Sequence, residues 1–323
     1  MINQSNSELA QTDTKGNMRI NRVNQLVDVF HNKTIQYPEF IKGINALTKT
    51  IEYSGIVGAG MMIEGEPGVG KSRLTEYFVK KYYQNHVRED AETIHLPIIS
   101  IGIPGRPTIP RVIEKILDKA NHVKPYSGNR ARQENRLRTM IEEQNVRMLV
   151  LDEYHHLVRT DKYTRDTFNF LKVLADDHKL AIVLSGLTSG RQALNAHEEL
   201  RERLSLYRIL LKPFTLKNSY ETFLDYLAAI NAILDEMGVK CIELDTDNFA
   251  PRLLLATMGK QRAIGRSIEG LLLEYDGKNS ITQKDFENAF AAHPFNHTLG
   301  TFNPFNKNTK LTTVEKKIAE YEK

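Results

Sequence analysis

The sequence lacks most of the features that would place a protein in a membrane or in an oxidising compartment. Its one cysteine, Cys241, cannot form an internal disulfide and fits a reducing cytosol. No apolar run approaches the ~20 residues that a membrane helix needs. The amino terminus is polar and has no apolar core of the kind found in secretory signals. We therefore expect a cytoplasmic protein with no membrane partner.

An excess of charge of one sign is also lacking. Among 323 residues, 44 lysines and arginines stand against 40 aspartates and glutamates, and the sequence pI is near 8.9. This mildly basic balance permits a polyanionic partner without requiring one. The apolar fraction of 41% is ordinary for a globular chain, and the length indicates two compact units or one large one.

The most informative motif is the stretch GEPGVGKS at residues 65–72, which matches the P-loop pattern. It follows a short apolar strand, Met61–Ile63, and precedes an expected helix. Glycines let backbone N–H groups wrap phosphates, and the helix presents its positive end to them. Lys71 is expected to reach the β- and γ-phosphates of ATP, and Ser72 to bind Mg²⁺. The expected nucleotide-binding residues of this stretch are Gly65, Glu66, Pro67, Gly68, Val69, Gly70, Lys71, Ser72 and Arg73.

A second motif supplies the acidic groups of a nucleotide hydrolase. Residues 147–153 read RMLVLDE, and an apolar run without alternation is typical of a parallel strand covered on both faces. Asp152 is expected to hold Mg²⁺ through water, and Glu153 to act as the base that polarises the attacking water. An ordinary acidic surface turn would be the better interpretation of this stretch alone, but not beside a P-loop.

Two further segments carry polar groups that could serve the same site. Ser185 and Thr188 follow an apolar run, and a hydroxyl there could sense the γ-phosphate or only cap the next turn. Arg203, with Arg201 as second choice, precedes the last expected strand. Such an arginine can act in trans on the nucleotide of a neighbouring subunit, and the alternative is a solvated helix face.

Together these motifs, with arginines placed before a strand that ends in KPF, resemble an AAA+ ATPase. The later stretch GKQRAIGRSI, residues 259–268, resembles the sensor-2 helix of that superfamily, in which an arginine contacts the γ-phosphate. Arg262 matches that position, and Arg266, one turn further, is the second candidate. The resemblance implies an ATPase that uses ATP and Mg²⁺.

Within the AAA+ proteins, the chain resembles the TnsC/TniB group, the ATPase regulators of Tn7-like and related transposons. The resemblance includes NRVNQLVD at residues 21–28 and IQYPEF at residues 35–40. It implies that Tyr37 lies near the adenine ring, with simple packing as an equal alternative. It also implies a ring or filament of about six or seven subunits per turn on duplex DNA. That assembly would link a TniQ/TnsD-like target selector to TnsA/TnsB-like transposase subunits.

The predicted fold is α/β: an AAA+ P-loop NTPase with a parallel five-stranded sheet flanked by helices, plus a small helical lid. The lid would rotate on nucleotide binding. The expected divisions are a disordered N-terminus at 1–20, a helical segment at 21–58, an α/β core at 59–215, a helical lid at 216–293 and a flexible tail at 294–323. The expected strands are Gly60–Glu64, Leu96–Ile101, Met148–Leu151, Leu180–Ser185 and Tyr207–Leu211.

The stretch between the second and third expected strands is the most basic. Lys119, Arg130 and Arg132 are the expected contacts to duplex DNA, made to phosphates without sequence preference. Solvated helix faces are the alternative for each residue. His155 and His156 invite a metal interpretation, but adjacent residues on a helix point about 100° apart, so a structural role is favoured.

Two other functions share parts of this pattern. A replication initiator or helicase loader has the same ATPase motifs, and only the amino-terminal segment and the lack of an added helix-turn-helix separate it. A protein-remodelling ATPase is disfavoured, because residues 101–108 read IGIPGRPT, which is short and basic and has no aromatic residue to grip a polypeptide.

Overall fold

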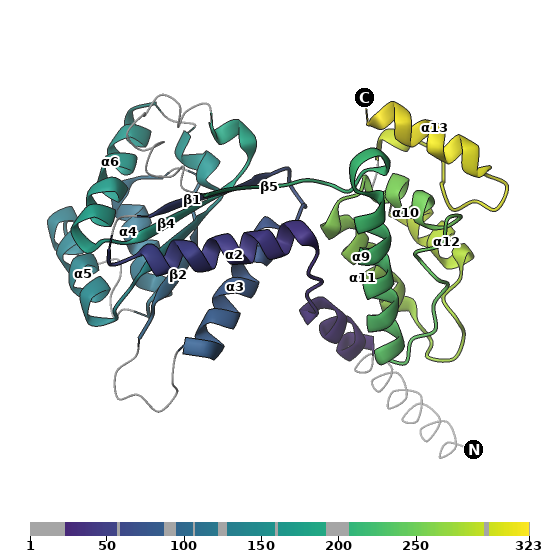
Figure 1. Cartoon of the computed structure of the whole chain (residues 1–323), viewed down its shortest axis with the longest axis horizontal. Coiled ribbons are helices and arrows are strands. Elements are labelled where there is room, and N and C mark those ends of the chain that lie inside the picture. The colour runs from purple at the N-terminus through teal and green to yellow at the C-terminus, as the bar shows by residue number, and fades with distance from the viewer. Residues whose placement is uncertain are drawn as a thin grey trace, which may run out of the picture. The chain divides into compact units, whose positions relative to one another are not determined.

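The computed structural model describes residues 23–56, 59–86, 95–105, 107–121, 128–158, 161–191, 207–293 and 297–322. The chain divides into two compact units, one of residues 38–212 and one that joins residues 213–323 to the residues up to 37. The first is an α/β unit and the second is helical (Figure 1). No helix in the described ranges is long and apolar enough to cross a membrane.

The α/β unit is built around one parallel sheet. Its strands are β1 (Gly60–Gly65), β2 (Ile98–Gly102), β3 (Met148–Asp152), β4 (Ala181–Gly186) and β5 (Tyr207–Leu211). They lie in the order β2-β3-β4-β1-β5, and each neighbouring pair is parallel. The register pairs Asp152 with Ser185 and Glu64 with Gly186. The carboxyl ends of β1, β3 and β4 therefore meet at one edge of the sheet, where ligands bind in open α/β folds.

Helices cover both faces of this sheet (Figure 1). They are α2 (Pro38–Tyr53), α3 (Lys71–His86), α4 (Ile109–Lys119), α5 (Arg130–Glu143) and α6 (Asp161–His178), with short 3-10 turns η1 (Tyr154–Val158) and η2 (Thr188–Gly190). Alternate strand residues such as Met62, Leu149 and Ile182 share one core with α4, α5 and α6. On the other face, α2 and α3 contact β1. Burial on both sides explains why β1, β3 and β4 are mostly apolar.

The sheet confirms the predicted fold class. Each of the five strands lies within two residues of its expected bounds, and the largest shift is at β2, which begins at Ile98 instead of Leu96. Leu96 packs against the core just before the strand, and its N–H donates to the carbonyl of Gln144. Leu96 is therefore part of the apolar run because it packs against the core, although it lies outside the strand.

The helical unit contains a compact set of helices after β5. They are α9 (Leu216–Glu236), α10 (Ala250–Thr257), α11 (Gln261–Glu274), α12 (Gln283–Ala292) and α13 (Leu311–Tyr321), with the 3-10 turn η3 (His297–Leu299). Three aromatic rings form part of its core: Phe249 lies 4.8 Å from Phe286 and 5.6 Å from Phe305, measured between ring centroids. Thr282 and Asp285 form a capping box that fixes the start of α12.

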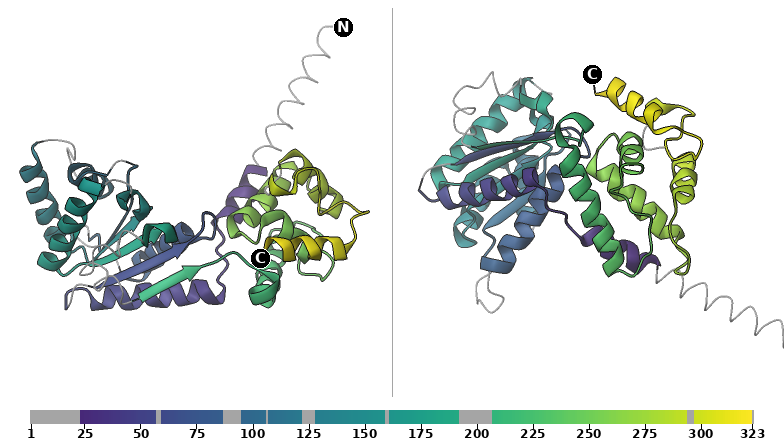
Figure 2. Two further views of the ribbon diagram at one scale, coloured as in Figure 1. Left: turned by 90° about the horizontal axis from the view of Figure 1, so that it is seen from above. Right: turned by 45° about the vertical axis from the view of Figure 1, so that its right-hand side comes forward.

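The carboxyl-terminal residues correct the expectation of a flexible tail at 294–323. Helix α13, yellow in Figure 2, contacts α10 and buries Val314 completely. Arg252 of α10 is only 5% exposed, and its guanidinium donates to the carbonyl oxygens of Pro304 (2.6 Å) and Thr309 (3.0 Å). The apolar positions of this segment complete the core of the helical unit, which is why it packs.

The amino-terminal boundary also differs from the expected one. Residues 23–32 form a helix that belongs to the helical unit, where His31 Nδ1 lies 2.7 Å from Glu269 Oε1 of α11. The two units divide between Tyr37 and Pro38, inside what was expected to be one helical segment. Pro38 starts α2, because proline is tolerated in the first turn of a helix but not in its interior.

Candidate nucleotide-binding site

The loop between β1 and α3 has the backbone of a phosphate-binding loop. Gly68 and Gly70 have φ values of 88° and 89°, a region that other residues rarely adopt. Gly65 is needed for a different reason, since a Cβ there would lie 2.3 Å from the carbonyl oxygen of Leu211 on β5. Helix α3 begins at Lys71, so its free N–H groups face the loop.

Lys71 and Ser72 contact two different parts of the site. Lys71 Nζ donates to the carbonyl oxygens of Gly65 (2.9 Å) and Glu66 (2.8 Å), so the ammonium is held over the loop. Ser72 Oγ donates to Asp152 Oδ2 at 2.7 Å. A hydroxyl and a carboxylate are hard oxygen ligands of the kind that Mg²⁺ prefers, and their direct contact places both within reach of one ion. These residues therefore fit a nucleotide with its Mg²⁺.

Asp152 is the centre of a hydrogen-bond network at the carboxyl edge of the sheet. Besides Ser72, it accepts through Oδ1 from Ser185 Oγ (2.7 Å) and from the backbone N–H of Glu153 (2.9 Å). Ser185 is fully buried, whereas Thr188 is exposed in η2. The structure therefore brings Ser185, and not Thr188, to the acid expected to hold Mg²⁺.

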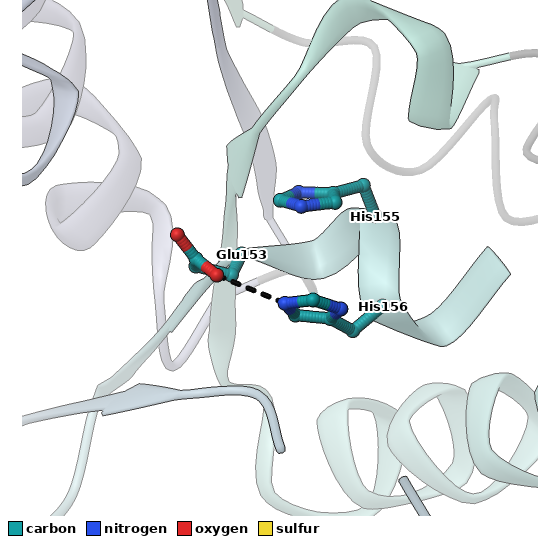
Figure 3. A group of neighbouring side chains, drawn as sticks. All are labelled: Glu153, His155 and His156. Atoms are coloured by element: carbon teal, nitrogen blue, oxygen red, sulfur yellow. Dashed lines mark hydrogen bonds and ion pairs between the residues drawn. The ribbon is translucent and has the colours of Figure 1, made fainter. Parts of the chain in front are cut away.

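Glu153 follows β3 directly in a left-handed backbone conformation, with φ of 59°. Its exposed carboxylate Oε2 lies 2.9 Å from Nε2 of His156 (Figure 3). The ring of His155 lies 4.5 Å from that of His156, and the three residues can bring potential ligand atoms within 4.8 Å of one another. This corrects the expectation that adjacent histidines diverge, because their side-chain rotamers turn the rings toward each other.

An ion pair between a buried glutamate and an exposed arginine lies immediately before the P-loop. Glu64 at the end of β1 is fully buried and accepts a hydrogen bond from Arg208 Nε of β5 at 2.5 Å. The hydroxyl of Tyr154 lies 3.3 Å from Glu64 Oε1 and 3.1 Å from the carbonyl oxygen of Leu187. Burial, and then the neighbouring Glu64, raise the pKa of Tyr154, so its hydroxyl stays a donor. Sequence reasoning missed this pair, although an acid within the apolar run GMMIEG was a usable signal.

The four arginines predicted to contact a nucleotide fall into two groups. Arg201 and Arg203 lie outside the described residues, so their role in trans stays a prediction. Arg262 and Arg266 are both exposed on α11 of the helical unit. Their exposure leaves both guanidinium groups accessible to a ligand, and the sensor role of Arg262 also stays a prediction.

Tyr37 belongs to the helical unit and is buried. Its ring packs edge-on against Phe214, with centroids 5.5 Å apart, and against Tyr226, with centroids 6.0 Å apart. The packing role that was the equal alternative for this side chain is therefore present, and its contact with adenine stays a prediction.

The three residues expected to contact DNA are all exposed. Arg130 forms an ion pair with Glu134, one turn further along α5, at 2.7 Å. The side chain of Arg132 forms no ion pair within the described part of the chain. Lys119 ends α4 and lines a cavity of about 550 Å³ beside β2, which also reaches Asp152. Of the three, Arg132 has the side chain most available to a phosphate.

Solved structures share this fold at low sequence identity. The ORC2 protein of Aeropyrum pernix, solved as ADPNP-ADP complexes, matches with a TM-score of 0.60 and 12% identity, over 81% of this chain and 71% of that one. The ORC1 protein of the same organism, solved in complex with DNA, gives 0.59 and 15%, over 82% and 68%. Cdc6p of Pyrobaculum aerophilum gives 0.57 and 16%, over 82% and 70%. At these identities the likeness establishes the AAA+ fold alone.

The family of the chain follows from its sequence. No curated protein sequence matches the chain. The family model described as bacterial TniB protein matches residues 25–213, which contain the P-loop, the Asp152 network and the whole sheet. Because this match spans more than half of the 323 residues, the chain belongs to the TniB family of transposition-type AAA+ ATPases.

Proposed function

We propose that this protein is an ATP-dependent, DNA-binding regulator of transposition. ATP bound between subunits drives assembly into a ring or filament on duplex DNA. The assembly links a TniQ/TnsD-like target selector to TnsA/TnsB-like transposase subunits, and hydrolysis takes it apart. The observation that carries the nucleotide part is the 2.7 Å hydrogen bond from Ser72 to Asp152, because it joins the ligands of two separate motifs at one point.

The proposed mechanism gives each side chain of the site one task. Lys71 leaves the loop carbonyls to bind phosphate oxygens, while Ser72 and Asp152 hold Mg²⁺, which when bound neutralises phosphate charge. Glu153 accepts a hydrogen bond from water and orients it toward the γ-phosphorus. Arg203 of a neighbouring subunit then stabilises the charge that develops in the transition state.

The proposal that the protein binds duplex DNA is supported by the exposed basic residues of α4 and α5. Arg132 is the sharpest candidate, because Arg130 already pairs with Glu134. The AAA+ fold is also that of an ORC1 protein solved with DNA. Contacts of this kind neutralise phosphates, so binding should be independent of sequence and weaken steeply with salt.

Replication initiation is the second candidate function. It is favoured by the fold alone, since the similar solved structures include ORC proteins, a Cdc6 protein and domain III of DnaA from Thermotoga maritima. The TniB match over residues 25–213 favours transposition instead. A protein-remodelling ATPase has less support, because residues 101–108, IGIPGRPT, carry no aromatic residue to grip a polypeptide.

The test is retention on an immobilised duplex of arbitrary sequence with ATP and Mg²⁺. Lys71→Ala should lose ATP binding and DNA retention together, and Glu153→Gln should bind ATP normally and stay on DNA longer than the wild type. Lys81→Ala, an exposed lysine on the same helix α3, is the matched control and should behave like the wild type. Normal retention of Lys71→Ala would contradict the P-loop assignment, and loss of ATP binding in Glu153→Gln would contradict the base assignment.

A further inference from the structure

The carboxylate of Glu153 is held by the residue three positions further along the chain. Within the described part of the chain, the one side chain that hydrogen-bonds it is His156, with Nε2 and Oε2 2.9 Å apart (Figure 3). The backbone N–H of His156 also donates to the carbonyl oxygen of Glu153 at 2.9 Å. His156 therefore contacts both the main chain and the side chain of Glu153. The side chain of Glu153 is 59% exposed and would otherwise sample several rotamers.

We infer that His156 is a positioning residue for ATP hydrolysis, which rests on the proposed role of Glu153 as the base. An imidazole N–H that donates to the carboxylate fixes the direction in which the second carboxylate oxygen faces the attacking water. Pre-organising a base in this way raises the turnover rate without changing how tightly ATP binds.

The tautomer of His156 follows from its surroundings. Its Nδ1 is buried and has no hydrogen-bond partner among the residues that the structure describes. A proton on Nδ1 would be a buried donor without an acceptor, which is costly. The proton therefore resides on Nε2, where it is donated to Glu153.

The same observation decides between a positioning role and a metal site. Glu153, His155 and His156 could bring three ligand atoms within 4.8 Å of one another. However, a histidine that binds a metal through Nε2 carries its proton on Nδ1 and normally donates it to an acceptor. Because His156 has no such acceptor in the described ranges, a hydrogen bond to Glu153 is the better assignment.

The turn that carries His156, η1, is fixed by the packing of Tyr154. Tyr154 is fully buried, and a Cβ added at Gly186 or at Gly190 would lie 2.7 Å from its ring. The two glycines therefore leave the space that this ring occupies. The ring of His155 lies 4.5 Å from that of His156 with a tilt of 34°. Tyr154 thus packs η1 against the end of β4, and this packing fixes the backbone that carries the imidazole of His156.

The test compares steady-state ATP hydrolysis of four variants with the wild type. His156→Ala should lower kcat about tenfold, with KM and ATP affinity within about twofold of wild type. His156→Gln should restore most of the rate, because its side-chain N–H group can take the place of Nε2–H. His31→Ala is the matched control: it removes a histidine–glutamate contact of 2.7 Å in the helical unit and should leave kcat unchanged. Combining His156→Ala with Glu153→Gln should lower kcat no further than Glu153→Gln alone.

Several results would overturn the inference. They are an unchanged or higher kcat in His156→Ala, no rescue by glutamine, and an additive loss in the double variant. Calorimetric titration with ZnCl₂ covers the metal alternative: micromolar Zn²⁺ binding that His156→Ala removes would reassign the cluster as a metal site. A wild type that hydrolyses no ATP, or a fully active Glu153→Gln, would instead refute the proposed role of Glu153 as the base, and the role of His156 would fall with it.

Discussion

Two polar side chains organise the two units, and they do so in opposite ways. In the α/β unit, Asp152 accepts hydrogen bonds from two serine hydroxyls and one backbone N–H at an edge that opens into a cavity of about 550 Å³. In the helical unit, Arg252 donates to the backbone carbonyls of Asn248, Pro304 and Thr309 and is only 5% exposed.

The difference between the two networks distinguishes a binding site from a structural clamp. Two of the three partners of Asp152 are side-chain hydroxyls, and a metal ion can displace them without breaking the sheet. The partners of Arg252 are fixed carbonyls that need their donor, because a buried acceptor without a partner is costly. A polar side chain with several partners that faces a cavity, such as Asp152, therefore indicates a binding site. One that is enclosed, such as Arg252, indicates a role in stabilising the fold.

The largest expected effect comes from Asp152→Asn. Asparagine keeps the size of the side chain but removes the charge that holds Mg²⁺, so we expect ATP hydrolysis to fall at least about 100-fold. Thermal unfolding should move by only a few degrees, since the amide oxygen can still accept from Ser185 and from the backbone N–H of Glu153, and the amide NH₂ group can donate to Ser72 Oγ. Asp177→Asn, which alters an exposed acid paired with Arg138, should leave hydrolysis unchanged. Equal losses in both variants would contradict the special role of Asp152.

Arg252→Met should do the reverse. Methionine keeps much of the volume, but the carbonyls of Pro304 and Thr309 lose their donor, so we expect the helical unit to lose about 3 kcal/mol of unfolding free energy in urea. ATP binding by the α/β unit should persist. Lys316→Met, an exposed change on α13, is the control and should have little effect. Unchanged stability in Arg252→Met would show that the tail does not depend on this arginine.

The smallest expected effect is the pH dependence of the helical unit. Burial raises the pKa of Cys241 from 9.0 to about 12. The unfolded thiol ionises first, so its contribution to stability is complete below pH 9 and is lost as the pH rises toward 12. The urea midpoint of the wild type should therefore fall more steeply over this range than that of Cys241→Ala. Parallel pH profiles would contradict the burial of this thiol.

The sequence allowed most of the α/β unit to be predicted, for a physical reason. Strands buried on both faces appear as apolar runs, and their chemistry is concentrated at their ends, so Asp152 could be read directly from RMLVLDE. Arg252 could not, because two of its three carbonyl partners lie 52 and 57 residues further along the chain and leave no local pattern. The contact of His156 with Glu153 was missed because it depends on rotamers and on the shape of a turn.

The most direct test of the proposed function is sedimentation velocity with ATP and Mg²⁺, with duplex DNA of arbitrary sequence, with both, and with neither. We predict large assemblies only when ATP and DNA are present together, and their loss in Lys71→Ala. Assembly with ATP that is indifferent to DNA would contradict a DNA-binding regulator and would leave the exposed arginines of α5 as an ordinary solvated surface.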